Sequence, residues 1–151
     1  QSGHSVSLSS DGTTVAIGTT GNDANGTDAG HVRVYEWNGS TWIKRGRDID
    51  GEAADDESGY SVSINNVGNR VAIGAPYNDA NGNSNSGHCR IFDYNGSQWI
   101  QVGQNIVGDN ANDQLGISVS MSGQGNRVVV GAPNAESGTG ISKIYEFVST
   151  T

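Results

Sequence analysis

Two polar loops carry the residues whose oxygen atoms could hold a metal ion. They supply four side chains each: Asn22, Asp23, Asn25 and Asp28 in the first, and Asn78, Asp79, Asn81 and Asn83 in the second. Calcium takes six to eight hard oxygen ligands, with carboxylates among them. The first loop offers two carboxylates and the second only one. Calcium is therefore a candidate cofactor, and a polar loop held by its own Asx turns is the competing interpretation.

A third candidate for cation binding is the acidic loop of residues 50–57. Its sequence, DGEAADDE, places five carboxylates within eight positions. Such a run could gather around a cation, but charge runs are more often solvated surface. Both interpretations remain open at this point.

Catalytic chemistry has little support in the sequence. His31 and His88 occupy the same position of an internal repeat, but Ile141 stands there in the third copy. His4 is likewise replaced in the later copies, and no Ser-His-Asp order recurs. The carboxylate pairs lie in loops, where nothing holds them at a defined separation. We predict that the protein is not an enzyme.

Three Asn-X-Ser/Thr sequons, at Asn25, Asn38 and Asn95, are candidate glycosylation sites if the chain is secreted. Asn-Gly is also ordinary hairpin chemistry. Asn38-Gly39 and Asn95-Gly96 predict two-residue type I′ hairpins.

A long internal repeat determines which elements must position these residues. Residues 59–76 read GYSVSINNVGNRVAIGAP, residues 116–133 read GISVSMSGQGNRVVVGAP, and residues 3–20 read GHSVSLSSDGTTVAIGTT. The downstream halves also match, GHVRVYEWNGSTWIKRG from residue 30 and GHCRIFDYNGSQWIQVG from residue 87. A fixed period of this length indicates an array of similar units. We divide the chain into repeat units 1–58, 59–115 and 116–151, the last lacking its outer strand.

Each complete unit predicts four antiparallel strands. The first (5–9, 61–65 and 118–122) alternates serine with an apolar residue, so one face is small enough for a neighbouring sheet to approach closely. The second covers 15–18, 71–74 and 128–131, and the third 31–37, 88–94 and 142–147. The fourth runs from 42 to about 47 and from 99 to about 104, and no segment predicts a helix. Four-stranded units repeated radially are β-propeller blades, about 2.6 of them here, in an all-β fold; a linear solenoid of sheets is the alternative.

Aromatic residues recur at the same places in the units. Trp37 and Trp42 flank one hairpin and correspond to Tyr94 and Trp99 in the next. Recurrence favours packing across strands and between blades, whereas an exposed pair could instead stack on sugars.

Charge and hydropathy restrict the partners. The net charge of −8 argues against nucleic acid, which needs clustered Lys and Arg, and no apolar run is long enough for membrane insertion. The single cysteine, Cys89, corresponds to Val32 and is predicted to be a small buried apolar residue. Because the chain begins with Gln1 and not Met, we expect a processed or truncated product.

The repeated motifs resemble the FG-GAP repeat of integrin alpha-chain propellers and related proteins. The resemblance rests on SGYSV at 58–62 with IGAP at 73–76, and on LGISV at 115–119 with VGAP at 130–133. The first unit departs from it, with Gly18-Thr19-Thr20 where Gly-Ala-Pro is expected. The resemblance implies a non-catalytic, extracellular protein for adhesion or ligand binding. It also implies calcium in a D-x-D-x-D-G turn, but the turns at Asp11, Val67 and Gln124 are too short and too poor in acids.

About 2.6 blades are fewer than the roughly four to eight of a closed propeller. The chain is therefore predicted to leave blade faces bare and to self-associate, or to join neighbouring blades of a longer chain. Our hypothesis is a non-enzymatic structural or adhesive repeat module located outside the cell or at its surface. The alternative is a propeller domain that binds calcium or a carbohydrate, and a glycan or protein ligand is compatible with both.

Overall fold

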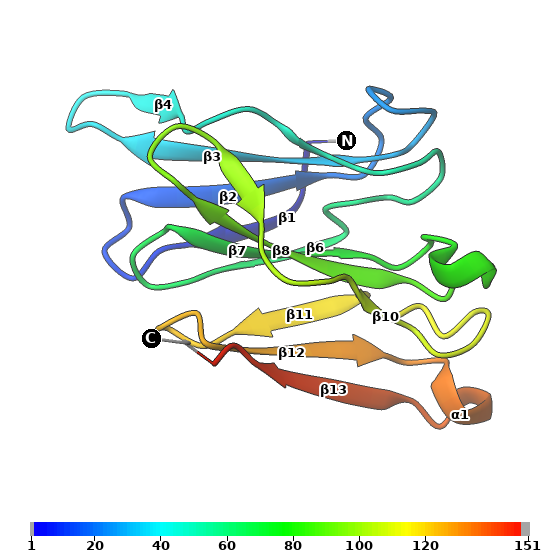
Figure 1. Cartoon of the computed structure of the whole chain (residues 1–151). Helices are drawn as coiled ribbons and strands as arrows, with labels where there is room; N and C mark the ends of the chain where they lie inside the picture. Colours follow the sequence, from blue (N-terminus) through cyan, green and yellow to red (C-terminus); the bar gives the residue numbers. More distant parts are fainter. Residues whose placement is uncertain (1, 149–151) are drawn as a thin grey trace.

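In the computed structural model, residues 2–148 are described, and they form three antiparallel sheets stacked face to face (Figure 1). The first contains β1 (Ser2–Leu8), β2 (Thr14–Thr19), β3 (His31–Trp37), β4 (Trp42–Lys44) and β5 (Ile49–Asp50). The second contains β6 (Ser61–Ile64), β7 (Arg70–Ala75), β8 (His88–Tyr94), β9 (Trp99–Gln101) and β10 (Ile106–Val107). The third contains β11 (Ser118–Met121), β12 (Arg127–Ala132) and β13 (Ile141–Glu146). The fold is all-β and of the β-propeller type.

The outer strand of each complete sheet differs from the prediction. It consists of two short pieces, β4 and β5 or β9 and β10, and both pieces pair with the same third strand. The break falls at Gly46 and Gly103, whose φ angles of +78° and +71° are incompatible with a continuous strand. The predicted uninterrupted strands to about residues 47 and 104 were therefore wrong.

Strand alternation divides the side chains of each sheet between two neighbours. In the second sheet Val62 and Ile64 face the first sheet and join a buried cluster with Val32 and Val34. The second cluster lies between the second and third sheets, where Ile91 packs with residues of β12. Each sheet thus buries apolar surface against the next, and none is buried alone.

The hairpins at Asn38 and Asn95 are four-residue loops and not the predicted type I′ turns. Only the glycine of each Asn-Gly pair has a positive φ, whereas a type I′ turn needs positive φ at both residues. The Asn38 side-chain oxygen accepts hydrogen bonds from the Ser40 and Thr41 amides at 2.9 and 2.8 Å. Asn95 does the same, so the asparagine side chain closes a wider loop.

Two short helical turns interrupt the loops after the second strands, where no helix was predicted. They are a 3₁₀ turn at Ala80–Gly82 and a single turn, α1, at Ala135–Gly138. Both contain residues with positive φ, among them Asn81 and Glu136. Turns this short carry no helical periodicity in sequence, so they could not be predicted from it.

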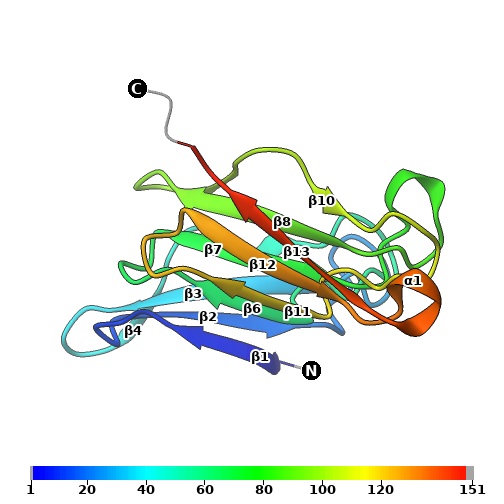
Figure 2. The same ribbon diagram turned by 90° about the horizontal axis from the view of Figure 1, so that it is seen from below.

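The two ends of the stack are uncovered. Looking from below, Figure 2 shows β11, β12 and β13 in front of the other two sheets. Within residues 2–148, the third sheet consists of β11, β12 and β13 and has no outer strand. At the other end, Val6 and Leu8 of β1 are 66% and 57% exposed.

Candidate functional site: the blade junctions and the two open faces

A serine–glycine contact joins the inner edges of neighbouring sheets. The Ser5 hydroxyl donates a hydrogen bond of 2.7 Å to the Gly59 carbonyl oxygen. The Ser61 hydroxyl does the same to Gly116, again at 2.7 Å. The contact is therefore the same at both junctions.

Glycine on the adjacent strand makes this approach sterically possible. A Cβ atom at Gly18 would lie 2.0 Å from the Gly59 oxygen, and one at Gly74 would lie 2.0 Å from the Gly116 oxygen. No side chain fits at such a distance. The small face predicted from the alternating serines is confirmed, and Gly18 at the first junction and Gly74 at the second complete it.

The second serine of each inner strand accepts a hydrogen bond across the same junction. The Ile64 amide donates to the Ser7 hydroxyl oxygen at 3.0 Å, and the Met121 amide donates to Ser63 at 2.9 Å. Both serines of each inner strand thus bond to the following blade, and these bonds fix how the two blades are aligned along their inner strands.

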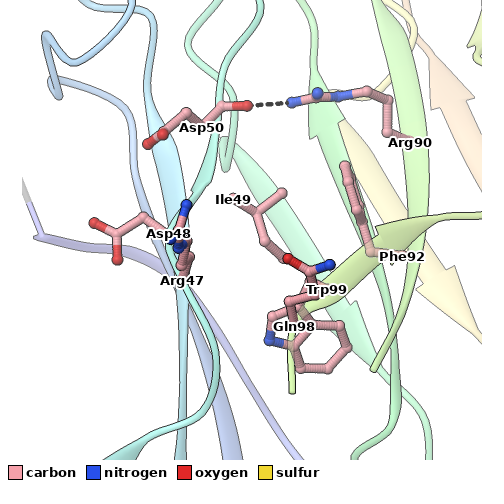
Figure 3. A pocket seen from close by; sticks show the side chains of 8 residues that line it. All are labelled: Arg47, Asp48, Ile49, Asp50, Arg90, Phe92, Gln98 and Trp99. Carbon is pink, nitrogen blue, oxygen red and sulfur yellow. Dashed lines mark hydrogen bonds between the residues drawn. The ribbon is translucent and has the colours of Figure 1, made fainter. Parts of the chain in front are cut away.

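A basic side chain bonds each junction near its outer edge. Arg90 donates to the Asp50 carbonyl oxygen at 2.7 Å, as the dashed line in Figure 3 shows. At the next junction, Lys143 donates to the Val107 carbonyl oxygen at 3.0 Å and to the Asp109 carboxylate at 2.7 Å. Our sequence analysis missed this bond, although the recurrence of a basic residue at positions 33, 90 and 143 was a signal for it.

The groove drawn in Figure 3 lies at the junction between the first and second sheets. Residues 47–50 form one wall, and Arg90, Phe92, Gln98 and Trp99 form the other. Its volume of about 220 Å³ is below the range of about 300–1,000 Å³ typical of small-molecule sites. The groove is a seam between blades and not a ligand pocket of ordinary size.

Within residues 2–148, one group of histidine and acidic side chains is compact enough to share a metal ion, His31 with Asp48 and Asp50. Arg33 donates to Asp48 at 2.9 Å, and Lys44 also pairs with it. Burial opposes ionisation of Asp48, but the hydrogen bonds from Lys44 and Arg33 lower the pKa of its carboxyl group. The two cations already neutralise this carboxylate, so the cluster is a weak candidate for a cation.

His88 is the most deeply buried histidine, 1% exposed, and neither ring nitrogen has a hydrogen-bond partner among the described residues. Burial, with a smaller effect of nearby Arg90, lowers the pKa of His88 to about 3. The imidazole is therefore neutral at pH 7. Its Nδ1 atom lies 3.6 Å from Oε2 of Glu52, but a neutral imidazole forms no ion pair with that carboxylate.

The predicted calcium ligands are distributed along their loops, and most of them hydrogen-bond to other groups of the protein. Asp23 accepts from the Asp28 amide at 2.9 Å, and Asp79 accepts from the Asn85 amide at 2.8 Å. The Asn22 oxygen accepts from the Ala24 amide. The other amide side chains act as donors: Asn25 to the Gly51 oxygen, Asn78 to Asp56, and Asn83 to the Asp109 oxygen. Asn81 adopts a positive φ of 56° in the 3₁₀ turn.

The acidic loop 50–57 is only partly solvated. Asp56 is 3% exposed and accepts from the Ala53 amide at 3.0 Å and from Asn78 at 2.9 Å. Burial raises the pKa of this carboxyl group. Asp56 therefore ties the loop to the following blade.

The three sequons lie in exposed loops but differ in their hydrogen bonding. Asn38 and Asn95 use their side-chain oxygen to close the hairpin loops, and both residues are exposed. The Asn25 side-chain nitrogen donates to the Gly51 carbonyl at 2.8 Å. A glycan needs that nitrogen, so Asn38 and Asn95 are the more accessible acceptors.

The recurrent aromatic pairs are covered in one blade and open in another. The ring centroids of Tyr94 and Trp99 lie 5.2 Å apart with the rings tilted at 47°, and the Trp99 indole donates to the Arg45 carbonyl oxygen of the preceding blade at 2.7 Å. Trp37 and Trp42 pair in the same way at 5.6 Å but remain 40% and 46% exposed. Cross-strand pairing is confirmed in both blades. Packing onto a neighbouring blade is seen for Trp99, and within residues 2–148 no blade precedes its counterpart Trp42.

Cys89 is completely buried in the cluster between the second and third sheets. Burial raises the pKa of its thiol to about 12. It packs as a small apolar residue, as predicted.

Comparison with known proteins supports the fold and the repeat. Residues 49–92, from β5 to β8, match the model of the FG-GAP repeat. No curated protein matches the sequence. Among solved structures, a protein described as a candidate 6-phosphogluconolactonase from Bacteroides uniformis is similar, with a TM-score of 0.53 and 16% identity. The likeness covers 95% of this chain and 41% of that one, and at this identity it concerns the fold alone.

Within residues 2–148, neither helical turn has the length and hydropathy of a membrane crossing.

Proposed function

We propose that the protein is a non-enzymatic structural or adhesive repeat module that acts by docking blade against blade. The observation that supports this most directly is the repeated junction, Ser5 to Gly59 and Ser61 to Gly116, together with two uncovered faces at the ends. A sheet that buries apolar residues only against its neighbours leaves the terminal sheets incomplete. The partner blades come from other copies or from a longer chain.

An extracellular or cell-surface location belongs to this proposal. The FG-GAP repeat at 49–92 is of a kind typical of such proteins. The accessible sequons at Asn38 and Asn95 and the lone buried cysteine are compatible with secretion.

Carbohydrate binding is the second candidate, and one observation favours it. Trp37 and Trp42 form an exposed aromatic pair on the first sheet, with rings tilted at 54° to each other, and exposed indole rings can stack on a sugar ring. Trp42→Ala would abolish glycan binding if this function holds. Equal binding by Trp42→Ala and the unchanged chain, or no binding to any glycan on an array, would remove the candidate.

The proposed function is tested by adding one blade to the chain. Residues 95–115, which supply an outer strand and the connecting loop, and then a second copy of residues 59–115 are joined after residue 147, so that a complete blade can reach the open third sheet. If blades dock there, the added segment folds and the melting temperature rises above that of the unextended chain. A matched fusion carrying Ser118→Arg should not show this rise in melting temperature. An added blade that stays unfolded in both fusions, in a chain that also remains monomeric at every concentration, would contradict the proposal.

A further inference from the structure

We propose that the two open faces of this chain fit each other, so that the first blade of one copy docks on the third blade of a second copy, head to tail. The inference rests on the proposed function and names the partner, a second copy of the same chain. It follows from the two junctions already present within one chain.

The third sheet carries the receiving half of a junction with nothing in it. Ser118 pairs across the strands with Gly131, as Ser5 pairs with Gly18 and Ser61 with Gly74. The Ser118 side chain is exposed, and its hydroxyl makes no hydrogen bond within residues 2–148. The hydroxyl and the glycine are therefore in place, but no carbonyl oxygen lies opposite them.

A hollow lies where that carbonyl should be. At the existing junction, Gly116 fits against Gly74, the Ala75 amide and the His88 carbonyl oxygen. The corresponding residues of the third sheet are Gly131, Ala132 and Ile141, and all of them line a cavity of about 350 Å³. The cavity has the position of the socket that receives Gly116 one blade earlier.

Gly3 is the matching element at the other end of the chain. It occupies the repeat position of Gly59 and Gly116. Its φ of +85° is close to their values of +89° and +100°, and no atom would contact a Cβ placed on it. Gly3 thus has the conformation of the two docked glycines without a partner.

The apolar rows are also complementary. Leu8 and Val6, exposed on β1, correspond to Ile64 and Val62, which are 7% and 9% exposed at the first junction. On the receiving side, Ile144 is 74% exposed, whereas its counterparts Val34 and Ile91 are 1% exposed. Docking buries the exposed members of both rows as their counterparts are buried within the chain.

A polar contact near the turns completes the match. Arg70 pairs with Asp93 and donates to the Gly125 carbonyl oxygen of the following blade at 2.8 Å. Its counterpart Arg127 pairs with Glu146 at 3.1 Å. Gly12 of a second copy is the counterpart of Gly125 and can accept the free N–H of Arg127.

The contact joins different surfaces of the two copies, so it is heterologous. A docked pair therefore still has one open first-sheet face and one open third-sheet face. Two variants, each with one of these faces blocked, can be mixed to test this arrangement. Leu8→Arg places a charge only on the open face of the first sheet, and Ile144→Arg places one only on the open face of the third sheet. The matched control is Ile100→Arg on β9, 42% exposed and outside both faces.

The native mass is measured by sedimentation over a range of concentrations. The unchanged chain and Ile100→Arg should grow beyond the 15.7 kDa of one chain, whereas Leu8→Arg and Ile144→Arg should each remain at that mass. An equimolar mixture of the two face variants should form particles of twice that mass and no larger, because each variant keeps one intact face. Val6→Arg with Ser120→Arg is a second pair, should either first variant fail to fold.

Three results would overturn the inference: an unchanged chain of 15.7 kDa at every concentration, assembly that neither face variant disrupts, or folded variants that do not pair. None of them removes the proposed function if the added blade of the fusion folds. An added blade that fails to fold beside a chain that self-assembles would instead show that the docking is between copies alone.

Discussion

The Ser61 hydroxyl donates to the carbonyl oxygen of Gly116, 55 residues further along the chain. The bond joins two separate sheets at a point where their backbones approach closely. A short hydroxyl can reach a carbonyl there because Gly74 leaves no side chain between them. The same arrangement at Ser5 makes it a property of the repeat.

Removing this hydroxyl should weaken the fold, because the Gly116 carbonyl oxygen loses its donor at a buried position. We expect Ser61→Ala to lower the free energy of unfolding by about 1 kcal/mol. Ser118→Ala makes the same change on the open face and should cost less than half as much at concentrations where the chain is monomeric. Denaturant titration measures both. Equal losses would show that the junction bond contributes nothing specific.

Gly74→Ala should be more damaging than any serine change. Its new methyl group would lie 2.0 Å from the Gly116 oxygen, so the two sheets must separate. We expect a loss of about 1–3 kcal/mol or more, as for other overpacked sites. Gly131→Ala is the control, since the nearest atom is the movable Ser118 hydroxyl and no blade lies opposite. A tolerated Gly74→Ala would contradict the close approach of the sheets.

Stability should fall as the pH falls from about 6.5 toward 3. His88 takes up a proton near pH 3 when folded and near 6.5 when unfolded, so the unfolded state binds more protons throughout this window. At pH 5 the cost is about 2 kcal/mol, or a fall in Tm of about 5 °C from its value at pH 7.

His88→Leu removes this group and should flatten the dependence of Tm on pH over the same window. Glu52 and Arg90 face His88 and remain in the variant. His31 and Asp56 also remain; burial lowers the pKa of His31 and raises the pKa of Asp56. The difference between the two slopes therefore reports His88. Parallel slopes would mean that the imidazole is not buried in its neutral form.

Two substitutions at Asp23 distinguish a calcium-binding loop from a loop that is held only by its own hydrogen bonds. Asp23→Asn keeps an acceptor for the Asp28 amide but removes the charge, whereas Asp23→Ala removes both. We expect the Asn variant to melt within about 1 °C of the unchanged chain with or without calcium, and the Ala variant to melt lower. A calcium-induced rise in Tm that Asp23→Asn abolishes would instead establish the metal site.

Much of this architecture could be predicted from the sequence because the repeat supplied internal comparisons. The Ser-apolar alternation at 61–64 predicted a sheet with one small face, and the structure shows Ser61 and Ser63 bonding across that face. The cross-strand pair of Trp37 and Trp42 followed from their positions on either side of a hairpin.

Other features depend on contacts that sequence spacing does not encode. The turn at Asn38 widened because its side chain competes for two backbone amides, which the Asn-Gly signal does not reveal. Arg90 reaches the Asp50 carbonyl, 40 residues away, and only the stacking of two sheets brings these atoms together.

The most direct test of the account is the hydrogen exchange of a single amide, that of Leu8. The equivalent amides of Ile64 and Met121 donate to serines of the preceding blade and should exchange slowly at all concentrations. Within residues 2–148 no blade precedes Leu8, so its amide should exchange rapidly in dilute protein and slowly in concentrated protein, when Ser120 of a second copy accepts from it. If the Leu8 amide exchanges equally fast in dilute and concentrated protein, the open faces do not meet as proposed.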